Sequence, residues 1–310
     1  MVQGDEGRPL AGTSYRVLRR IGAGSSSEVY EALGRRGERR ALKVLRAVHA
    51  GSREATARLA QEGRALAALD HPHVVRIEDA GVTADGRPFL VMPLLRGETL
   101  RERLDARGPL STGAAVAVAL DVLDGLSAAH RAGIVHRDVK PANVFLERPA
   151  GGRPGVLGRD RRARWQAAGG PERAILIDFG IAKVIGDVIA PTTGGHVLGT
   201  PRYLAPEQIL GGCVDARTDV YAVGLLLFEA IAGRGPFPAG DAIEAMRAHL
   251  HTPAPRLRAL LCVPKGIDRA VARAVAKAPA LRWPTAAAMA EALAAGEGGA
   301  RVVPARAGER

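Results

Sequence analysis

The feature that most constrains this chain is the octapeptide HRDVKPAN at residues 136–143. A phosphoryl-transfer site needs a carboxylate to orient the attacking hydroxyl, a cation for the moving phosphoryl group and an oxygen ligand for Mg²⁺. Asp138, Lys140 and Asn143 offer these groups in that order, and Pro141 stiffens the loop by fixing φ. An ordinary solvated turn is the alternative, because Asp, Lys, Pro and Asn are common turn residues. The stretch predicts a phosphoryl-transfer loop that other motifs must support.

The composition is that of a globular protein. The chain has 310 residues, enough for one large or two small domains, with 47% hydrophobic and 25% charged residues. No apolar run approaches the roughly 20 residues that span a bilayer, and the first residues lack the pattern of a secretory signal. Two cysteines are too few for a disulfide framework or a metal cage. We therefore expect a cytoplasmic protein with no membrane span.

The strong positive charge does not by itself indicate a nucleic-acid partner. The formal net charge is +12 and the pI is near 10.7, but arginine is spread along the whole chain and aromatic residues are only 4%. We interpret the charge first as a compositional bias that favours solubility and second as a match to an acidic partner. No specific nucleic-acid binding is expected.

A glycine-rich turn follows a strand predicted at residues 15–21. Gly22 and Gly24 lack a Cβ, so backbone N–H groups at such a turn can approach phosphates. An ordinary hairpin turn would explain the two glycines equally well in isolation. The turn is therefore weak evidence for a nucleotide until neighbouring motifs are considered.

A lysine on the strand predicted at residues 40–45 needs a charged partner. Ala41, Lys43 and Leu45 share one face of that strand, amid apolar neighbours. In the next predicted helix, Glu62 lies on the apolar stripe, where an unpaired carboxylate would cost several kcal/mol of desolvation. We predict a Lys43–Glu62 ion pair. The alternative is an amphipathic helix whose glutamate reaches solvent.

Later segments are predicted from their periodicity and turn signals. Residues 74–77 and 89–92 are predicted strands joined through a hairpin turn at Asp85 and Gly86. Ser111 is expected to cap a long helix that Gly133 ends and that delivers the octapeptide. Two short strands at 143–146 and 174–177 follow, and the second leads into the tripeptide DFG at 178–180. A strand that ends in an ordinary turn is the alternative for that tripeptide.

These motifs, in this order, resemble protein kinases, and the chain is similar to bacterial eukaryotic-like (Hanks-type) serine/threonine kinases over residues 15 to about 293. The resemblance implies an α+β fold with two lobes. The small N-lobe, about 15–95, is expected to be mostly antiparallel β-sheet with one regulatory helix, and the larger C-lobe, about 96–295, mostly helical. A polar leader at 1–14 and a flexible tail at 296–310 are expected outside the domain.

The resemblance also implies ATP and Mg²⁺ as cofactors, with Mn²⁺ able to substitute. Asp138, Lys140, Asn143 and Thr200 would form the catalytic group, and Asn143 and Asp178 would hold the metal. Met92 would be the gatekeeper of the adenine pocket, with the hinge following it. The residues implied at the ATP site are Ile21, Gly22, Ala23, Gly24, Val29, Ala41, Lys43, Glu62, Met92, Pro93 and Leu95. Ser27 departs from the family pattern, which has a third glycine at that position.

Two positions carry the expectation about the substrate. Lys140 and Thr200 resemble the residues of serine/threonine kinases and differ from those of tyrosine kinases. Residues 199–207 match the peptide-binding region of the family, which implies protein substrates with Ser/Thr acceptors. The resemblance further implies that Asp219 holds the catalytic-loop backbone and that Arg282 pairs with Glu207. A simple helix N-cap and a lone surface arginine are the respective alternatives.

A basic insertion separates the two short strands that flank the catalytic loop. Residues 149–173 contain Arg153, Arg159, Arg161, Arg162 and Arg164, with few acidic residues to balance them. Low hydrophobicity and like charge predict a segment without a fixed structure. A neutral surface insertion and a docking loop for an acidic partner are the two interpretations.

A regulatory prediction joins Arg137 to Thr192 and Thr193 on the predicted activation segment. A phosphothreonine there would carry roughly −1.5 to −2 charge and three acceptor oxygens, enough to bind a nearby guanidinium and order the segment. Ordinary loop threonines in a constitutively active enzyme are the alternative. The sequence leaves the oligomeric state open.

Two other functions compete with the protein kinase. A catalytically silent scaffold of the same fold would be a binding module, but such chains usually lose Lys43, Asp138 or Asp178, and all three are present. A small-molecule phosphotransferase shares the site chemistry but has no need of a peptide-binding region at 199–207. The sequence therefore favours a protein kinase.

Overall fold

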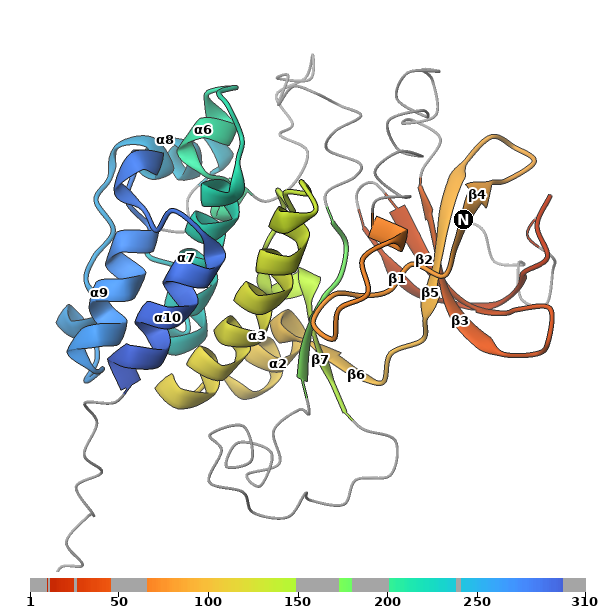
Figure 1. The fold of residues 1–310 in the computed structure, drawn as a ribbon, viewed down its shortest axis with the longest axis horizontal. Coiled ribbons are helices and arrows are strands. Elements are labelled where there is room, and N and C mark those ends of the chain that lie inside the picture. The colour runs from red at the N-terminus through yellow and green to blue at the C-terminus, as the bar shows by residue number, and fades with distance from the viewer. Residues whose placement is uncertain are drawn as a thin grey trace, which may run out of the picture.

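The computed structural model describes residue 10 and residues 12–24, 27–45, 66–148, 173–179, 201–237 and 241–297. These residues form two lobes, with a five-stranded sheet at one end and a helical body at the other, and a three-stranded sheet lies on the side of the helices that faces the first sheet (Figure 1). The prediction of a two-lobed α+β fold, with an antiparallel small lobe and a mostly helical large lobe, is confirmed.

The small lobe is an antiparallel sheet with the strand order β1-β2-β3-β5-β4. Its strands are β1 (Arg16–Ala23), β2 (Ser27–Leu33), β3 (Arg39–Leu45), β4 (Asp79–Val82) and β5 (Pro88–Pro93). Successive side chains of a strand point to opposite faces. Leu42 and Val91 belong to a core on one face, whereas Ala41 and Met92 pack on the other against Ile175 of the large lobe. The second face therefore closes over the junction of the lobes.

The predicted strand at residues 74–77 is wrong. Val74 forms only an isolated bridge to Leu176, and the strand that pairs with β5 is β4, which begins at Asp79. The apolar side chains of Val74, Val75 and Ile77 are buried because this linking stretch packs between the lobes. Strand β4 lies at the edge of the sheet and is mostly exposed, so its sequence carries no apolar pattern.

The hairpin turn between β4 and β5 is confirmed. Gly86 has φ of 80°, a left-handed conformation that glycine adopts without a Cβ clash, and its N–H donates to Thr83 O at 2.9 Å. Turn residues such as Asp85 and Gly86 were therefore a better guide to this hairpin than the apolar run before it.

A short antiparallel sheet in the large lobe frames the catalytic segments. Its strands, in the order β6-β7-β8, are β6 (Gly97–Thr99), β7 (Val144–Glu147) and β8 (Arg173–Leu176). Strand β7 directly follows the 3-10 helix η2 (Pro141–Asn143), and β8 leads into Asp178. The pairing of β7 with β8 therefore places the end of the octapeptide beside the start of the tripeptide at 178–180.

Two capped helices lead from the first lobe to the catalytic loop. In α2 (Leu100–Arg107), the Thr99 side chain accepts from Glu102 N and the Glu102 carboxylate accepts from Thr99 N, which forms a capping box. Ser111 caps α3 (Thr112–Arg131) as predicted, with its hydroxyl accepting from Ala114 N. Gly133, at φ of 75°, follows the end of α3. These signals fix where the octapeptide begins.

Helix α3 is long and apolar enough to cross a membrane by length and composition, contrary to the expectation that no apolar run approaches that length. More than half of its apolar window is buried in this fold, where α3 contacts α7 (Ala216–Ala232), α10 (Ala286–Glu297) and β8 (Figure 1). Its apolar sequence is accounted for by packing in the core of the large lobe.

Helix α7 is buried on every side, as its apolar sequence predicts, and contacts α9 (Lys265–Ala274) and the short 3-10 helix η3 (Pro201–Tyr203). The remaining helices of the large lobe are α6 (Pro206–Ile209), α8 (Ala242–His251), and the short 3-10 helices η4 (Leu257–Ala259) and η5 (Pro279–Leu281). The N-cap of α7 is Asp215, whose side chain accepts from Arg217 N at 2.8 Å. Asp219 is therefore not the cap; it lies in the first turn and serves another contact.

Candidate active site

The octapeptide folds back on itself around the carboxylate of Asp138. Lys140 Nζ donates to Asp138 Oδ2 at 2.8 Å, and Asn143 Nδ2 donates to the same oxygen at 2.9 Å and to the Asp138 carbonyl at 2.8 Å. These hydrogen bonds form because the chain turns into η2 at Pro141, which brings the Asn143 side chain close to Asp138. The three polar groups that the sequence singled out therefore meet in one site.

A buried carboxylate from α7 holds the backbone of this loop. Asp219 is only 1% exposed, and its Oδ2 accepts from His136 N at 2.8 Å while its Oδ1 accepts from Arg137 N at 2.9 Å. His130 Nε2, near the end of α3, lies 2.8 Å from Oδ2. Three donors offset the desolvation of this carboxylate. Asp219 thus joins α3, α7 and the catalytic loop.

His136 connects the loop to the segment after β8. Burial lowers the pKa of the His136 imidazole, although Asp219 and Asp138 oppose that shift, so the ring is neutral at pH 7. Its Nδ1 accepts from Asp138 N at 3.3 Å, and its Nε2 lies 3.2 Å from Ile177 O, which requires the Nε2–H tautomer. The ring also packs on Phe179 with 4.4 Å between centroids. Asp138 and the residues at 177–179 are therefore positioned by the same side chain.

The strand lysine has a carboxylate partner, as burial on an apolar face requires. Lys43 Nζ lies 2.8 Å from Asp178 Oδ1, and the Lys43 side chain is 11% exposed. Glu62, the partner predicted from sequence, lies outside the described residues. The pair with Asp178 was missed because it joins β3 to the end of β8 across the lobes, a contact that no sequence period reports.

A small cavity of about 10 Å³ lies beside this ion pair. Its lining includes Lys43, Met92, Asp178 and Phe179, with apolar side chains from residues 66–90 completing it. A space of that size holds about one water molecule. The predicted gatekeeper Met92 therefore lines a small cavity together with Lys43 and Asp178.

The backbone is left-handed at two residues of the site. Arg137 has φ of 64° and Asp178 has φ of 59°, and they are the only non-glycine residues with positive φ in the described part of the chain. Such conformations cost on the order of 1–3 kcal/mol each and persist where surrounding contacts impose them. At Arg137 those contacts are the N–H donated to Asp219 and the carbonyl that accepts from Gln208 Nε2 at 2.9 Å. Neither residue is a glycine, so the sequence carries no signal for this conformation.

Most of the residues predicted at the ATP site share one region of the small lobe. Gly22 lies opposite Val29, Val29 opposite Lys43, and Ala41 opposite Met92 across successive strands. Val29 and Leu95 pack in the same apolar cluster as Ala41 and Met92. Strand register therefore lines these side chains along the face that closes over the large lobe.

The rest of the predicted ATP set lies at the edges of that region. Ile21 and Ala23 are in the exposed end of β1, Gly24 N donates to Ser27 O at 2.8 Å in the turn, and Pro93 ends β5. The predictions for Thr192, Thr193 and Thr200 lie outside the described residues. So does most of the basic insertion, of which the structure describes only Arg173.

The predicted pair of Glu207 and Arg282 forms inside the large lobe. Arg282 Nη1 donates to Glu207 Oε1 at 2.7 Å and Nη2 donates to Oε2 at 2.8 Å, with Arg282 almost fully buried. Burial acts to raise the pKa of Glu207, but hydrogen bonds from Arg282 and the Thr218 hydroxyl outweigh it and hold the pKa below its ordinary value. The pair anchors α6, which begins within the predicted peptide-binding region at residues 199–207.

The donor set fits a hard divalent cation. Asp178 presents a carboxylate, and Asn143 directs its amide N–H groups to Asp138, which turns its amide oxygen the other way. Among the described residues no group of three or more His, Cys, Asp and Glu side chains forms a metal cage. Mg²⁺ is commonly bound by one or two protein oxygens together with substrate phosphates. The residues present match that mode.

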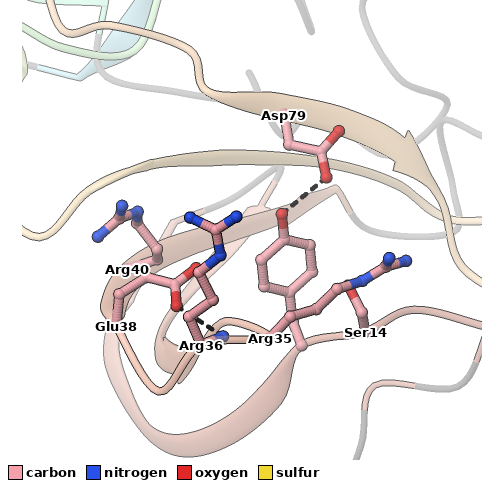
Figure 2. Close-up of a pocket in the computed structure, with 7 residues that line it drawn as sticks. Ser14, Arg35, Arg36, Glu38, Arg40 and Asp79 are labelled. Atoms are coloured by element: carbon pink, nitrogen blue, oxygen red, sulfur yellow. Dashed lines mark hydrogen bonds between the residues drawn. The ribbon is translucent and has the colours of Figure 1, made fainter.

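A larger cavity of about 450 Å³ lies on the outside of the small lobe, beside the turn between β2 and β3 (Figure 2). Tyr15 donates a hydrogen bond to Asp79 Oδ2 at 2.7 Å there, and Glu38 accepts from Arg36 N at 2.9 Å. Its lining is Ser14, Tyr15, Arg35, Arg36, Glu38, Arg40 and Asp79. None of the predicted catalytic or nucleotide-binding residues lines it.

The two lobes, the loop around Asp138 and the Lys43–Asp178 pair between the lobes define a protein of the kinase-fold class. The chain belongs to the protein kinase domain family, whose family model matches residues 15–275. Members of this family use ATP as the phosphoryl donor together with a divalent metal ion.

Curated bacterial serine/threonine-protein kinases are similar to most of the chain. PknL of Mycobacterium tuberculosis (strain H37Rv) is 40% identical over 283 residues, which are 90% of this chain and 65% of PknL. PkaB of Streptomyces coelicolor is 41% identical over 273 residues, which are 87% of this chain and 60% of PkaB. The chain thus spans less than two thirds of the length of these relatives.

A solved structure supports the same fold. The crystal structure of the Mycobacterium tuberculosis PknI kinase domain superposes with a TM-score of 0.70 at 28% sequence identity. The match covers 95% of this chain and 99% of that one. The two-lobed arrangement is therefore that of a bacterial kinase domain.

Proposed function

We propose that this chain is a serine/threonine protein kinase that transfers the γ-phosphoryl group of ATP to serine or threonine hydroxyls of proteins. The observation that carries the proposal is the Asp138 carboxylate, which receives hydrogen bonds from Lys140 and Asn143 in a loop anchored by Asp219. A carboxylate fixed in this way can orient an acceptor hydroxyl and take its proton.

Each residue of the site has a role in this proposal. Asp138 orients the hydroxyl, and Lys140 donates a hydrogen bond to that carboxylate and offsets charge on the moving phosphoryl group. Lys43 holds Asp178 in place and would contact phosphate oxygens of the nucleotide. Asn143 fixes Asp138 and offers its amide oxygen to the metal.

Mg²⁺ is the proposed metal, with Mn²⁺ able to substitute, and it would neutralise charge on the phosphates. Asp178 and Asn143 would hold it. The ATP base would lie against Val29, Ala41 and Met92, which share one face of the sheet with Lys43. The Pro93 carbonyl and the Leu95 N–H would bind the adenine edge. We assign residues 15–295 to the kinase domain, with its lobes meeting near residue 95, and place its activity in the cytoplasm.

Ser/Thr acceptors are proposed because Lys140 contacts the catalytic carboxylate, as the resemblance to serine/threonine kinases requires. Thr200 is the second residue behind the proposed Ser/Thr acceptors, because its position also resembles that of serine/threonine kinases. The experiment is transfer from radiolabelled ATP to generic protein and to matched peptides with Ser, Thr or Tyr, by wild type and Asp138→Asn. Labelled Ser and Thr peptides, lost in the variant, support the proposal. Failure to label any protein or peptide leaves the silent scaffold, and labelling of a small-molecule alcohol alone leaves the small-molecule phosphotransferase.

We also propose that phosphorylation of Thr192 or Thr193 activates the enzyme through Arg137. Support comes from the Arg137 backbone, which is fixed at both its N–H and its carbonyl beside Asp138. A phosphothreonine near that guanidinium would form charge-assisted hydrogen bonds. Mass spectrometry after incubation with ATP, with rates before and after phosphatase treatment, tests this. Unmodified threonines, or equal rates, would disprove it.

A further inference from the structure

Gln208, on the short helix α6, connects two separate segments of backbone through its side-chain amide. Its Oε1 accepts from Ala205 N at 3.0 Å, and its Nε2 donates to Arg137 O at 2.9 Å. These partners determine the orientation of the amide, because a backbone N–H can only donate and a carbonyl can only accept. A carboxylate in its place would have no N–H for the Arg137 carbonyl. The position therefore requires a side chain that carries a donor and an acceptor next to each other.

One end of this link is the segment predicted to bind the peptide substrate. Ala205 lies in the described part of the predicted peptide-binding region at residues 199–207 and is fully buried. Its carbonyl accepts from Gln208 N at 2.9 Å, so the backbone and the side chain of Gln208 both hold it. The preceding residue, Glu207, is fixed in the large lobe by Arg282. Gln208 therefore belongs to a well-anchored part of the region that would receive the peptide.

The other end of the link is the left-handed backbone just before the catalytic carboxylate. Arg137 has φ of 64°, and its N–H donates to Asp219 Oδ1 at 2.9 Å. Such backbone at a residue with a Cβ persists where the surrounding contacts impose it. Asp219 holds the N–H, and Gln208 holds the carbonyl of the peptide group that leads into Asp138. Release of this carbonyl would let the peptide group rotate and would turn the Asp138 carboxylate with it.

We propose that Gln208 is a positioning residue for phosphotransfer. It fixes the peptide group between Arg137 and Asp138 relative to the segment that receives the substrate, and so aligns the Asp138 carboxylate with the acceptor hydroxyl. The inference rests on the proposed protein kinase activity and deepens it. Gln208 lies on a different element from the predicted nucleotide-binding residues, so its loss lowers kcat and leaves the KM for ATP unchanged.

The test measures kcat and the KM for ATP of wild type, Gln208→Met and Gln208→Glu on one serine peptide, from about pH 8 to about pH 5.5. Methionine offers neither hydrogen bond, so kcat should be roughly tenfold below wild type at every pH. Glutamate should be equally impaired at about pH 8, where a carboxylate faces the Arg137 carbonyl. In acid its protonated form can donate to that carbonyl, which raises its pKa above the ordinary value, so its rate relative to wild type should rise.

This recovery distinguishes positioning from a weakened fold. A variant that is only destabilised would fall further below wild type in acid, because the fold itself loses stability there. Asp138 and Asp219 also titrate beside the Arg137 backbone, but wild type contains them too, so their effect cancels in the ratio. Ser111→Ala is the matched control, since it removes a capping hydrogen bond from α3 in the same lobe and should leave kcat unchanged.

Three results would overturn the inference alone: wild-type kcat in Gln208→Met, a raised KM for ATP in that variant, or a Gln208→Glu rate that does not rise relative to wild type in acid. A wild-type enzyme that does not phosphorylate the peptide overturns the proposed function and this inference with it.

Discussion

The carboxylate of Asp219 and the backbone N–H of His136 lie 2.8 Å apart although 83 residues separate them in the chain. The same side chain also accepts from Arg137 N and lies 2.8 Å from His130 Nε2. The conformation of the catalytic loop therefore depends on a residue of α7 whose carboxylate holds two backbone N–H groups of the loop.

Separate replacements of Asp219 and Asp215 should distinguish the loss of the catalytic-loop anchor from the loss of a helix N-cap. Asp219→Ala leaves two loop N–H groups unpaired in the core, so we expect a loss of about 3 kcal/mol in the free energy of unfolding and a large fall in kcat. Asp215→Ala, which removes the N-cap of the same helix and a partly exposed ion pair with Arg217, should cost about 1 kcal/mol and spare activity. Urea unfolding and steady-state kinetics measure both. Equal effects of the two variants would contradict the proposed anchoring role.

Asp138→Asn and Asp178→Ala should each reduce phosphotransfer by about 100-fold or more, because one removes the proposed base and the other a proposed metal ligand. Both residues are partly exposed, so the far-ultraviolet circular dichroism spectrum should stay that of wild type. Asp105→Asn is the control, because it makes the same kind of change at an exposed residue of α2 outside the candidate active site. Its phosphotransfer rate should stay that of wild type. Autophosphorylation near the wild-type rate in either variant would disprove the assignment.

The pair of Glu207 and Arg282 should show strong coupling. Arg282→Met leaves the Glu207 carboxylate buried without its main partner, so we expect a loss of about 3–5 kcal/mol of stability. Adding Glu207→Gln to Arg282→Met removes the stranded charge and should recover part of that loss. Denaturant unfolding of wild type, both single variants and the double variant gives the coupling energy. If the losses of the two single variants simply add up in the double variant, the ion pair contributes little beyond the packing of each side chain on its own.

Stability should fall in mild acid because of His249. Burial, reinforced by the positive charge of Lys277, lowers the pKa of this imidazole to about 4, and its Nδ1 lies 2.9 Å from the Tyr221 hydroxyl. The unfolded chain, with a pKa near 6.5, binds the proton first, so stability is lost as pH falls from about 6.5 to about 4.

The expected loss attributable to His249 is on the order of 2 kcal/mol near pH 5. His249→Gln keeps a hydrogen-bonding partner for Tyr221 but does not titrate, so its stability should change less between about pH 7 and about pH 5. Glu207 interferes little above about pH 5, because its pKa is depressed and its stabilising contribution is lost as pH falls from its ordinary pKa of 4.5 toward the lower value in the folded protein. A pH profile identical to that of wild type would rule out this source.

The basic insertion should be dispensable for the fold. Glu147 and Arg173 lie opposite each other at the open end of the β7–β8 pair, so a short hairpin turn can replace the residues between them without a change of register. We expect almost unchanged melting temperature and turnover on a generic peptide. A docking role would appear instead as weaker phosphorylation of an acidic protein substrate only. A collapse of the melting temperature would show that the insertion packs against the lobe.

Much of the architecture could be predicted because its signals are local. Strand alternation located β3 around Lys43, and Ser111 and Gly133 bounded α3, since caps and glycine conformations depend on nearby residues. The order of the motifs predicted the family, and the octapeptide predicted that Asp138, Lys140 and Asn143 act together. Their chemical roles stay predictions until they are measured.

The sequence by itself predicted most of the helices and strands, the family and the catalytic loop. Only the tertiary structure decided that Val74 lies in a buried linker and not in a strand, because an apolar run has the same pattern in either setting. It alone placed Lys43 on Asp178 and Arg101 on Glu229, and gave Arg137 a left-handed backbone. These contacts join segments far apart in the chain, and a buried charge takes whichever partner packing brings within reach, which no local pattern encodes.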